Sequence, residues 1–507
     1  MARLLQFVRR NPKSDYFLLG CLVVVCILVT QWWLSQEARP PHWDFALNLE
    51  YSLGYLDSFK DFDVVHLFSY HYYPPLLYWK TIPFYLIFGE SLSSAVLVAS
   101  IFMGLLAFSV YAIGKELWNR STGILGAVFV LTLPLVITQF RQYQPDGPMA
   151  ALVAFTLLCL IKSKEFSYRR WSLLLGAAVG AGMMMKWTYA LAALLPVGYA
   201  LVIAFRRDWR KRLPNVAKAV FVAAIIAGPW YLAHGDSLLR DLTTNAIDAG
   251  VREGDPAVFS LAGVTYYAKN LLDVQLYLFP LLLLLVGVAV SFWKRNYLQR
   301  NIYPLLLVAG VYISFTLLTN KDARYTLPFI GGVAVLATYW VTLLGKRSRA
   351  VLTGLLVTYG LVTYAAITFG TGWLPHEVRI LGSGKGHTLW AQHGYIYGPP
   401  SSEEWHLESV FKKISEDSPG VPKTAFYEGS DTAGVWISPP GVAYYAKRYS
   451  VTLVSPHGTS HTNDRQSASY VITRSAAPSS GEPGLVVLQT WQLPDGSYFT
   501  LSRRVGL

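Results

Sequence analysis

Apolar residues recur along most of this chain in long blocks, which short polar connections separate. The first block covers residues 17–34, and further blocks of roughly 16–22 residues follow it, which is the length that a helix needs to cross a bilayer. These further blocks centre near residues 102, 131, 154, 180, 197, 225, 282, 310, 335 and 360. The pattern predicts a polytopic all-α membrane domain over residues 1–370, with about eleven transmembrane helices.

The first block is interpreted as a retained span rather than a cleavable signal peptide. Basic residues precede it (Arg3, Arg9, Arg10 and Lys13), but no small-residue cleavage site follows it. The sequence Gln31-Trp32-Trp33 is typical of an aromatic anchor at the membrane interface. An odd number of spans then places the two termini on opposite sides of the membrane.

The connections between the blocks alternate in charge. The basic ones contain Lys115 and Arg120; Lys162, Lys164, Arg169 and Arg170; Arg206, Arg207, Arg210, Lys211 and Arg212; Lys294, Arg295 and Arg300; Lys346, Arg347 and Arg349. The positive-inside rule predicts that these loops and the N-terminus are cytoplasmic. The opposite face then receives residues 35–90, 141–147, 234–270, 320–325 and everything after about 371.

Two of these outer segments are long. The loop at residues 35–90 is rich in aromatic residues, and its part from Leu76 to Phe88 is interrupted by prolines, which favours a juxtamembrane helix lying in the interface. The loop at residues 234–270 is polar and is predicted to be partly helical. Neither segment is counted as a span.

After Trp373 the composition changes to that of a soluble domain. Ser401-Ser402-Glu403-Glu404 predicts a helix start, and short β-rich runs follow at residues 424–427, 451–454, 470–473, 485–493 and 498–501. Residues 371–507 are therefore predicted to form an extracytoplasmic soluble α/β domain.

Composition supports a membrane protein and argues against a nucleic-acid partner. The chain is 53% hydrophobic and 14% charged, whereas soluble domains are about a quarter charged. The net charge of +13 comes from the basic loops, which are topology signals rather than a nucleic-acid surface. Cys21, Cys26 and Cys159 all lie in apolar blocks, so neither disulfides nor a metal site are inferred.

Two carboxylates at the edges of outer loops are candidate catalytic groups, because charge at a bilayer boundary is costly. Asp44 follows the first span, where it could act as a general base toward a hydroxyl; the alternative is that it caps a helix. Asp146 lies in Gln144-Pro145-Asp146-Gly147, where the alternative is a cap or a turn.

Three cations also lie near outer span ends: Arg141, Lys186 and Arg324. A phosphate at the membrane surface would bind such side chains, and arginine in particular offers forked donors. The alternative is snorkelling, in which a long basic side chain extends along apolar surface so that its charge lies at the interface and binds no ligand. No tight ligand spacing supports a metal between Asp44, Asp146 and His71, so the cofactor requirement stays open.

Taken together, several motifs resemble those of one family. They are Asp44; His71-Tyr72-Tyr73-Pro74-Pro75-Leu76-Leu77-Tyr78-Trp79; Phe88-Gly89-Glu90-Ser91; Asp146; Lys186-Trp187; and Arg324-Tyr325 with Pro328. In order and topological placement they resemble the GT-C glycosyltransferases of the protein-mannosyltransferase and aminoarabinose-transferase type (glycosyltransferase family 39 and relatives). The resemblance covers roughly residues 10–370.

The resemblance implies a membrane transferase that uses a polyprenyl-phosphate-linked sugar as donor. Asp44 then matches the acidic residue at the catalytic centre, Asp146 the second-loop acid, and Arg324 with Tyr325 the pair near the donor phosphate. Tyr73-Pro74-Pro75, with His71 before it, matches the His/Lys-Pro-Pro segment. Phe45 after Asp44 and Tyr73 before the prolines depart from many relatives, which leaves the substrate open and argues against an aminoarabinose-type enzyme in particular.

The resulting hypothesis is an inverting transfer of a sugar to a hydroxyl of a glycan, lipid or protein, at the outer face of a bacterial inner membrane. Asp44 would be the base, Arg324 with Arg141 or Lys186 would bind phosphate, and Asp146 would position the sugar or the acceptor. Three rivals remain: a transporter or flippase of lipid-linked glycans, a non-catalytic scaffold, and a ligase or polymerase of lipid-linked oligosaccharides. The charges at span edges and the long first loop favour the transferase.

Overall fold

The chain forms two compact units in a computed structural model that describes residues 12–69, 71, 73–244, 248–380, 386–417, 421–429, 436–454, 462–479 and 481–505. The helical unit comprises Met1–Trp33, His71–Lys80 and Val96–Pro399, and the mixed unit comprises Leu34–Tyr70, Thr81–Ala95 and Pro400–Leu507. The N-terminal residues Arg3, Arg9 and Arg10, on which part of the topology prediction rests, lie outside the described residues.

Each apolar block of the sequence is helical, and nearly all residues of these helices lie in the helical unit. The helices are α2 (Pro12–Gln36), α6 (Leu92–Leu117), α7 (Arg120–Leu131), α8 (Pro134–Gln139), α9 (Asp146–Ser163), α10 (Arg169–Met185), α11 (Tyr189–Arg206), α12 (Trp209–Ala233), α16 (Leu278–Trp293), α17 (Arg295–Thr316), α18 (Ile330–Tyr339) and α19 (Lys346–Phe369). Among the described residues, six of these helices (α2, α6, α9, α11, α12 and α19) are long and apolar enough to cross a membrane. A helical membrane-type domain is thus confirmed, and the count of eleven spans stays a prediction.

The block centred near residue 131 is not one continuous helix. α7 ends at Leu131, and α8 begins at Pro134 after Leu133, whose backbone is extended (φ −74°, ψ 137°). The cause is local, because a residue that precedes proline is disfavoured in the helical region. The block near residue 335 is likewise composite, with the 3-10 turns η3 (Leu327–Phe329) and η4 (Trp340–Leu343) on either side of α18.

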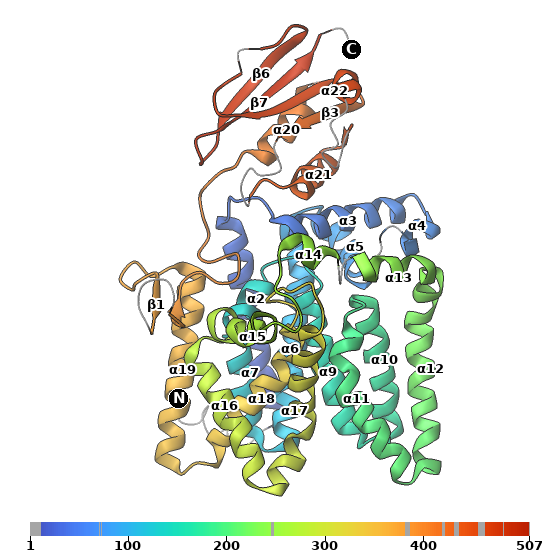
Figure 1. The fold of residues 1–507 in the computed structure, drawn as a ribbon, viewed down its shortest axis with the longest axis vertical. Helices are drawn as coiled ribbons and strands as arrows, with labels where there is room; N and C mark the ends of the chain where they lie inside the picture. The colour runs from blue at the N-terminus through green and yellow to red at the C-terminus, as the bar shows by residue number, and fades with distance from the viewer. Residues whose placement is uncertain are drawn as a thin grey trace. The chain divides into compact units, whose positions relative to one another are not determined.

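Small residues let these helices approach closely. A Cβ added to Gly176 of α10 would overlap the carbonyl of Ala219 in α12, and one added to Gly287 of α16 would overlap the carbonyl of Leu336 in α18. Figure 1 shows α10, α11 and α12 side by side. Close backbone approach at small residues is typical of helix packing in membranes.

The spans differ in how far the rest of the protein encloses them. Of the 18 residues of α9, 83% are buried, whereas in the most apolar 18-residue stretch of α12 only 22% are. Val220, Phe221 and Ile225 of α12 are exposed. The exposed faces are apolar, which suits contact with lipid tails. α9, which begins at Asp146, is therefore a central helix of this unit.

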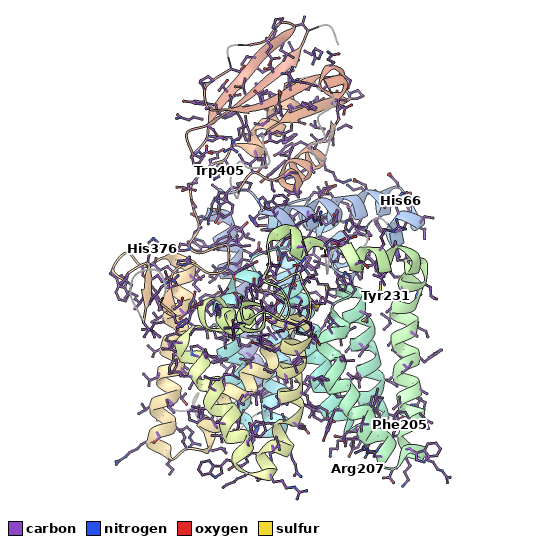
Figure 2. All side chains as sticks on the ribbon, in the orientation of Figure 1. His66, Phe205, Arg207, Tyr231, His376 and Trp405 are labelled. Carbon is purple, nitrogen blue, oxygen red and sulfur yellow. The ribbon has the colours of Figure 1, made fainter. Side chains whose placement is uncertain are left out.

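The basic loops gather at one end of the helical unit. Lys162 forms an ion pair of 2.7 Å with Glu116, and Arg300 donates to the carbonyl of Leu117 at 3.4 Å. Figure 2 shows Phe205 and Arg207 at this end, whereas Tyr231 and His376 lie toward the other end. The loops that the sequence assigns to one face therefore lie together.

The other end carries the segment between α12 and α16 together with a short β-ribbon. As predicted, the segment is partly helical, with α13 (Gly235–Thr243), α14 (Ala249–Glu253), α15 (Leu261–Asn270) and the π turn η2 (Leu271–Gln275). The ribbon pairs β1 (Glu377–Arg379) with β2 (Thr388–Ala391) in antiparallel fashion. Residues 371–399, which the composition assigns to the C-terminal domain, belong to the helical unit.

The mixed unit joins helices of the first long loop to the C-terminal sheet. The loop supplies α3 (Trp43–Lys60), α4 (Val64–Ser69) and the second half of α5 (Leu76–Phe88). The C-terminal part contributes α20 (Leu407–Asp417), α21 (Pro439–Arg448), α22 (Thr462–Ser467), β3 (Lys423–Glu428), β4 (Val451–Leu453), β5 (Tyr470–Ser475), β6 (Leu485–Gln492) and β7 (Tyr498–Arg504). α21 packs along α3.

The sheet has the strand order β4-β3-β5-β7-β6. β3 pairs in parallel with β4 and β5, and β7 pairs in antiparallel fashion with β5 and β6. The five predicted β-rich runs are confirmed as these strands. The predicted helix start was wrong, since α20 begins at Leu407 after His406, which has a positive φ of 53°. α21 was not predicted at all, although Ser438 caps it and its first two residues are prolines.

Candidate active site

Asp146 and Lys186 form a buried ion pair in the helical unit. Lys186 Nζ lies 2.8 Å from Asp146 Oδ1, and the two residues are 5% and 1% exposed. Asp146 is the first residue of α9, where the positive end of the helix dipole favours a carboxylate. Lys186 is the C-cap that follows α10, and its backbone is extended. Pairing of two charges is what makes their burial tolerable.

Two cations flank the ring of Tyr325. Lys186 Nζ lies 5.1 Å from the ring centre, and the guanidinium carbon of Arg324 lies 5.7 Å from it. Cation–π attraction favours this arrangement and brings the two positive charges to one ring. The structure thus places four of the predicted site residues together: Asp146, Lys186, Arg324 and Tyr325.

Arg324 is held by groups that the sequence analysis did not single out. Its Nη1 donates to Gln144 Oε1 at 2.9 Å, and its Nε lies 3.0 Å from Asp322 Oδ2. The hydroxyl of Tyr395 donates to the same oxygen of Asp322 at 2.7 Å. Burial and the nearby charge of Asp322 raise the pKa of Tyr395, which therefore keeps its proton. Two carboxylates balance two cations in this cluster, so it is close to neutral.

Arg141 lies against the end of α19. Its Nη1 donates to the carbonyl of Ile367 at 3.2 Å, its Nη2 bonds the hydroxyl of Thr368, and its guanidinium carbon lies 5.2 Å from the ring centre of Trp33. The last carbonyls of a helix carry partial negative charge and attract a cation. These contacts join α2, α8 and α19 rather than adding a cation to the ring of Tyr325.

His71 and Tyr73 form a stacked pair at the start of α5. Their ring centres lie 5.9 Å apart at an interplanar angle of 22°, and the N–H of Tyr73 donates to His71 Nδ1 at 3.3 Å. Burial lowers the pKa of His71 to about 3, so the ring is neutral at physiological pH. A neutral ring that accepts at Nδ1 carries its proton on Nε2.

Asp44 lies in the mixed unit, in the first turn of α3. The N-cap of this helix is His42, so Asp44 lies inside the helix rather than at the cap. Its carbonyl accepts a hydrogen bond of 2.6 Å from Asn48 Nδ2. Asp44 is only partly buried.

The three residues that sequence reasoning missed left different signals. Gln144 and Asp322 each lie two residues from a predicted site residue, so a search of the neighbours of Asp146 and Arg324 would have found them. Tyr395 lies 73 residues from Asp322 and left no local signal. Within the described ranges, no group of three or more His, Cys, Asp or Glu residues could hold a metal ion.

Comparisons with known proteins extend this description. The family model described as dolichyl-phosphate-mannose-protein mannosyltransferase matches residues 73–232. The undecaprenyl phosphate-alpha-4-amino-4-deoxy-L-arabinose arabinosyl transferase of Erwinia tasmaniensis is 27% identical over 363 residues, which are 64% of this chain and 62% of that protein. That of Yersinia enterocolitica is 29% identical over 339 residues, which are 63% of this chain and 59% of that protein. The chain thus spans about three fifths of the length of these curated relatives.

Solved structures match over a greater length. ArnT from Cupriavidus metallidurans bound to undecaprenyl phosphate has a TM-score of 0.61 at 14% identity, with 98% of this chain and 99% of that chain covered. The oligosaccharyltransferase AglB of Archaeoglobus fulgidus, in complex with an inhibitory peptide and a dolichol-phosphate, has a TM-score of 0.53 at 11% identity over 91% of this chain and 70% of that chain. This protein therefore has the fold of the GT-C glycosyltransferases, and its resemblance to the protein-mannosyltransferase and aminoarabinose-transferase type is confirmed.

Proposed function

We propose that this protein is a membrane glycosyltransferase that moves a sugar from a polyprenyl-phosphate donor to a hydroxyl acceptor. The observation that carries the proposal is the cluster at Tyr325, where Lys186 and Arg324 both approach one ring. Lys186 follows the C-terminal end of α10, and the basic residue Arg169 begins the same helix at its other end. A lipid phosphate at a membrane interface needs such cations. The similarity to transferases named for undecaprenyl phosphate supports this choice of donor.

The proposed chemistry is a single displacement. A hydroxyl oxygen of the acceptor attacks the anomeric carbon, the bond from that carbon to the phosphate oxygen breaks, and polyprenyl phosphate leaves with the bonding electrons. Asp44 takes the hydroxyl proton as general base. Attack from the side opposite the phosphate inverts the anomeric carbon.

The cation cluster supplies the electrostatic part of the mechanism. Arg324 and Lys186 stabilise the negative charge that develops on the leaving phosphate, because fixed cations in a buried site act more strongly than in water. Asp146 holds Lys186 in place at 2.8 Å and positions the sugar or the acceptor. Arg141 stabilises the end of α19, which leaves Lys186 as the partner of Arg324.

The same proposal includes the topology. The basic loops and the N-terminus face the cytoplasm. The chain crosses a bacterial inner membrane about eleven times, and the reaction takes place on the extracytoplasmic side. Residues 371–507 then lie outside the cytoplasm, with the soluble α/β domain beginning after the β-ribbon. The acceptor is a glycan, lipid or protein of the cell envelope.

Sugar release from labelled polyprenyl-phosphate donors by the purified protein tests the proposal. We expect turnover by the wild type and at least a hundredfold loss in Asp44→Asn, because general-base catalysis contributes about 10²–10⁴-fold. Asp57→Asn is the matched control, since Asp57 is an exposed aspartate further along the same helix α3. This control is expected to keep its activity.

Two outcomes would contradict the proposal. Activity of Asp44→Asn near that of the wild type would remove Asp44 as the base. Donors that stay intact yet cross vesicles containing the protein would replace the transferase with a transporter of lipid-linked glycans.

A further inference from the structure

We propose that Trp436 and Arg39 form a sugar-binding wall beside Asp44, and that this wall selects the acceptor. The inference rests on the proposed function, in which Asp44 is the base. It concerns the mixed unit alone, where a tryptophan of the C-terminal domain meets the residues that lead into α3.

The contacts of Trp436 define the wall. The guanidinium carbon of Arg39 lies 4.6 Å from the centre of the Trp436 ring. The ring of His42 meets that of Trp436 nearly at a right angle, with 6.3 Å between centres and 76° between planes. His42 is the N-cap of α3, and Asp44 follows two residues later in the first turn. In the chain, the proposed base is thus two residues from a residue whose ring contacts Trp436.

The C-terminal domain holds Trp436 at this place through several contacts. The N–H of Ala38 donates to the carbonyl of Ser401 at 2.8 Å, which joins the two segments by their backbones. Ser438, two residues after the tryptophan, caps α21 by accepting from the N–H of Gly441 at 3.2 Å. α21 in turn packs along α3. A side chain so close to a capped and packed helix has little freedom to move away.

The charges of the wall bear on which chemical groups of an acceptor it can bind. Both guanidinium nitrogens of Arg39 that face Glu37 bond its carboxylate, at 2.6 Å each, and both side chains are largely buried. This pairing leaves the Arg39–Glu37 pair without net charge. The guanidinium carbon of Arg39 lies 4.6 Å from the centre of the indole ring, and Trp436 as a residue is partly buried.

An indole that is partly open to solvent suits a sugar ring. The face of an aromatic ring is negative, and the C–H groups on one face of a pyranose are weakly positive, so the two surfaces attract and exclude water. Binding sites place apolar aromatic surface beside a few polar groups in the same way. A glycosylated acceptor would therefore lie on Trp436 with a hydroxyl near Asp44, and the wall favours a glycolipid or glycan over an unglycosylated peptide.

Steady-state kinetics of the full-length protein test this inference. A glycolipid extract of bacterial envelopes serves as the acceptor. In the first series the acceptor concentration is varied at a saturating concentration of labelled donor, and in the second the donor concentration is varied. In Trp436→Ala we expect the KM for the acceptor to rise about tenfold or more, while the KM for the donor stays unchanged. Trp436→Phe keeps an aromatic face and is expected to recover most of the acceptor affinity.

Lys447→Met is the matched control for a purely structural role. It removes an ion pair of 3.3 Å with Asp57, which also joins α21 to α3 but carries no aromatic face. We expect it to leave the KM for the acceptor unchanged.

The outcomes separate the inference from the function on which it rests. If the wild type turns over no donor with any acceptor, the proposed function fails. If the wild type is active and Trp436→Ala has the acceptor KM of the wild type, the function stands and the wall is refuted. Equal rises in Trp436→Ala and Lys447→Met, with no recovery in Trp436→Phe, would show a domain contact only and would also refute it.

Discussion

The buried pair of Asp146 and Lys186 allows a prediction whose sign follows from electrostatics. The perturbations are Asp146→Asn, Lys186→Met and the double variant, each close to the native side chain in size. The two charged atoms lie 2.8 Å apart and the residues are 1% and 5% exposed. Each single variant leaves one charge buried without its partner, whereas the double variant removes both charges.

The magnitude follows from the distance. Coulomb's law with an effective dielectric constant of about 20 gives roughly 6 kcal/mol of attraction between unit charges at 2.8 Å. The loss of water by both ions offsets much of this gain. Removing one partner of a buried pair typically costs about 3–5 kcal/mol, while replacing the whole pair by neutral groups is often close to neutral. We therefore expect the double variant to be more stable than either single variant.

Thermal unfolding in detergent, followed by intrinsic fluorescence, is the assay. Because the order of melting temperatures decides the outcome, irreversible unfolding at a fixed scan rate does not spoil the comparison. Lys211→Met, at an exposed lysine in the first turn of α12, is the control and should melt like the wild type. A double variant that melts below both single variants would refute the reasoning, because it would mean that the two losses add and that the charges do not compensate each other.

Three further predictions follow from single contacts. The pKa of His71 is about 3 in the folded state and about 6.5 in an unfolded chain, so the free energy of unfolding falls as the pH drops from about 6.5 toward 3. His71→Gln should flatten this pH dependence of the melting temperature. An unchanged slope in the variant would contradict the prediction. Gly176→Ala should destabilise the protein by about 1–3 kcal/mol, because the new Cβ overlaps the carbonyl of Ala219. Gly354→Ala is the control, because its new Cβ meets no atom within 4 Å. Equal melting temperatures of the two variants would count against the close packing. Arg141→Met should lower the melting temperature without raising the KM for the donor, since its contacts are with the end of α19; a raised KM with normal melting would reassign Arg141 to the phosphate.

The local patterns of the sequence were sufficient for much of the architecture. Helices fall on every apolar block and strands on every predicted β-rich run, because the hydropathy of a segment depends on its own residues and on its environment of lipid or water. The basic loops lie at one end of the helical unit, because basic and less basic connections alternate between successive apolar blocks. The break before Pro134 was also written locally, in the restriction that proline places on Leu133.

The sequence also pointed to most of the candidate site. Charge at a span edge points to Asp146, Lys186 and Arg324, and the family resemblance adds Tyr325. The structure places both cations at the ring of Tyr325 and pairs Asp146 with Lys186. Their roles in catalysis stay proposals.

Only the tertiary structure decided which of these groups are partners. Lys186 pairs with Asp146 across 40 residues, and Arg324 bonds Gln144 across 180 residues. Arg141, which reads in the sequence like a third phosphate ligand, instead meets the end of α19. Any of these cations would satisfy the local pattern equally well. The choice among them depends on how the helices pack, and that packing is set by side-chain shape over the whole chain rather than by the order of residues in one segment.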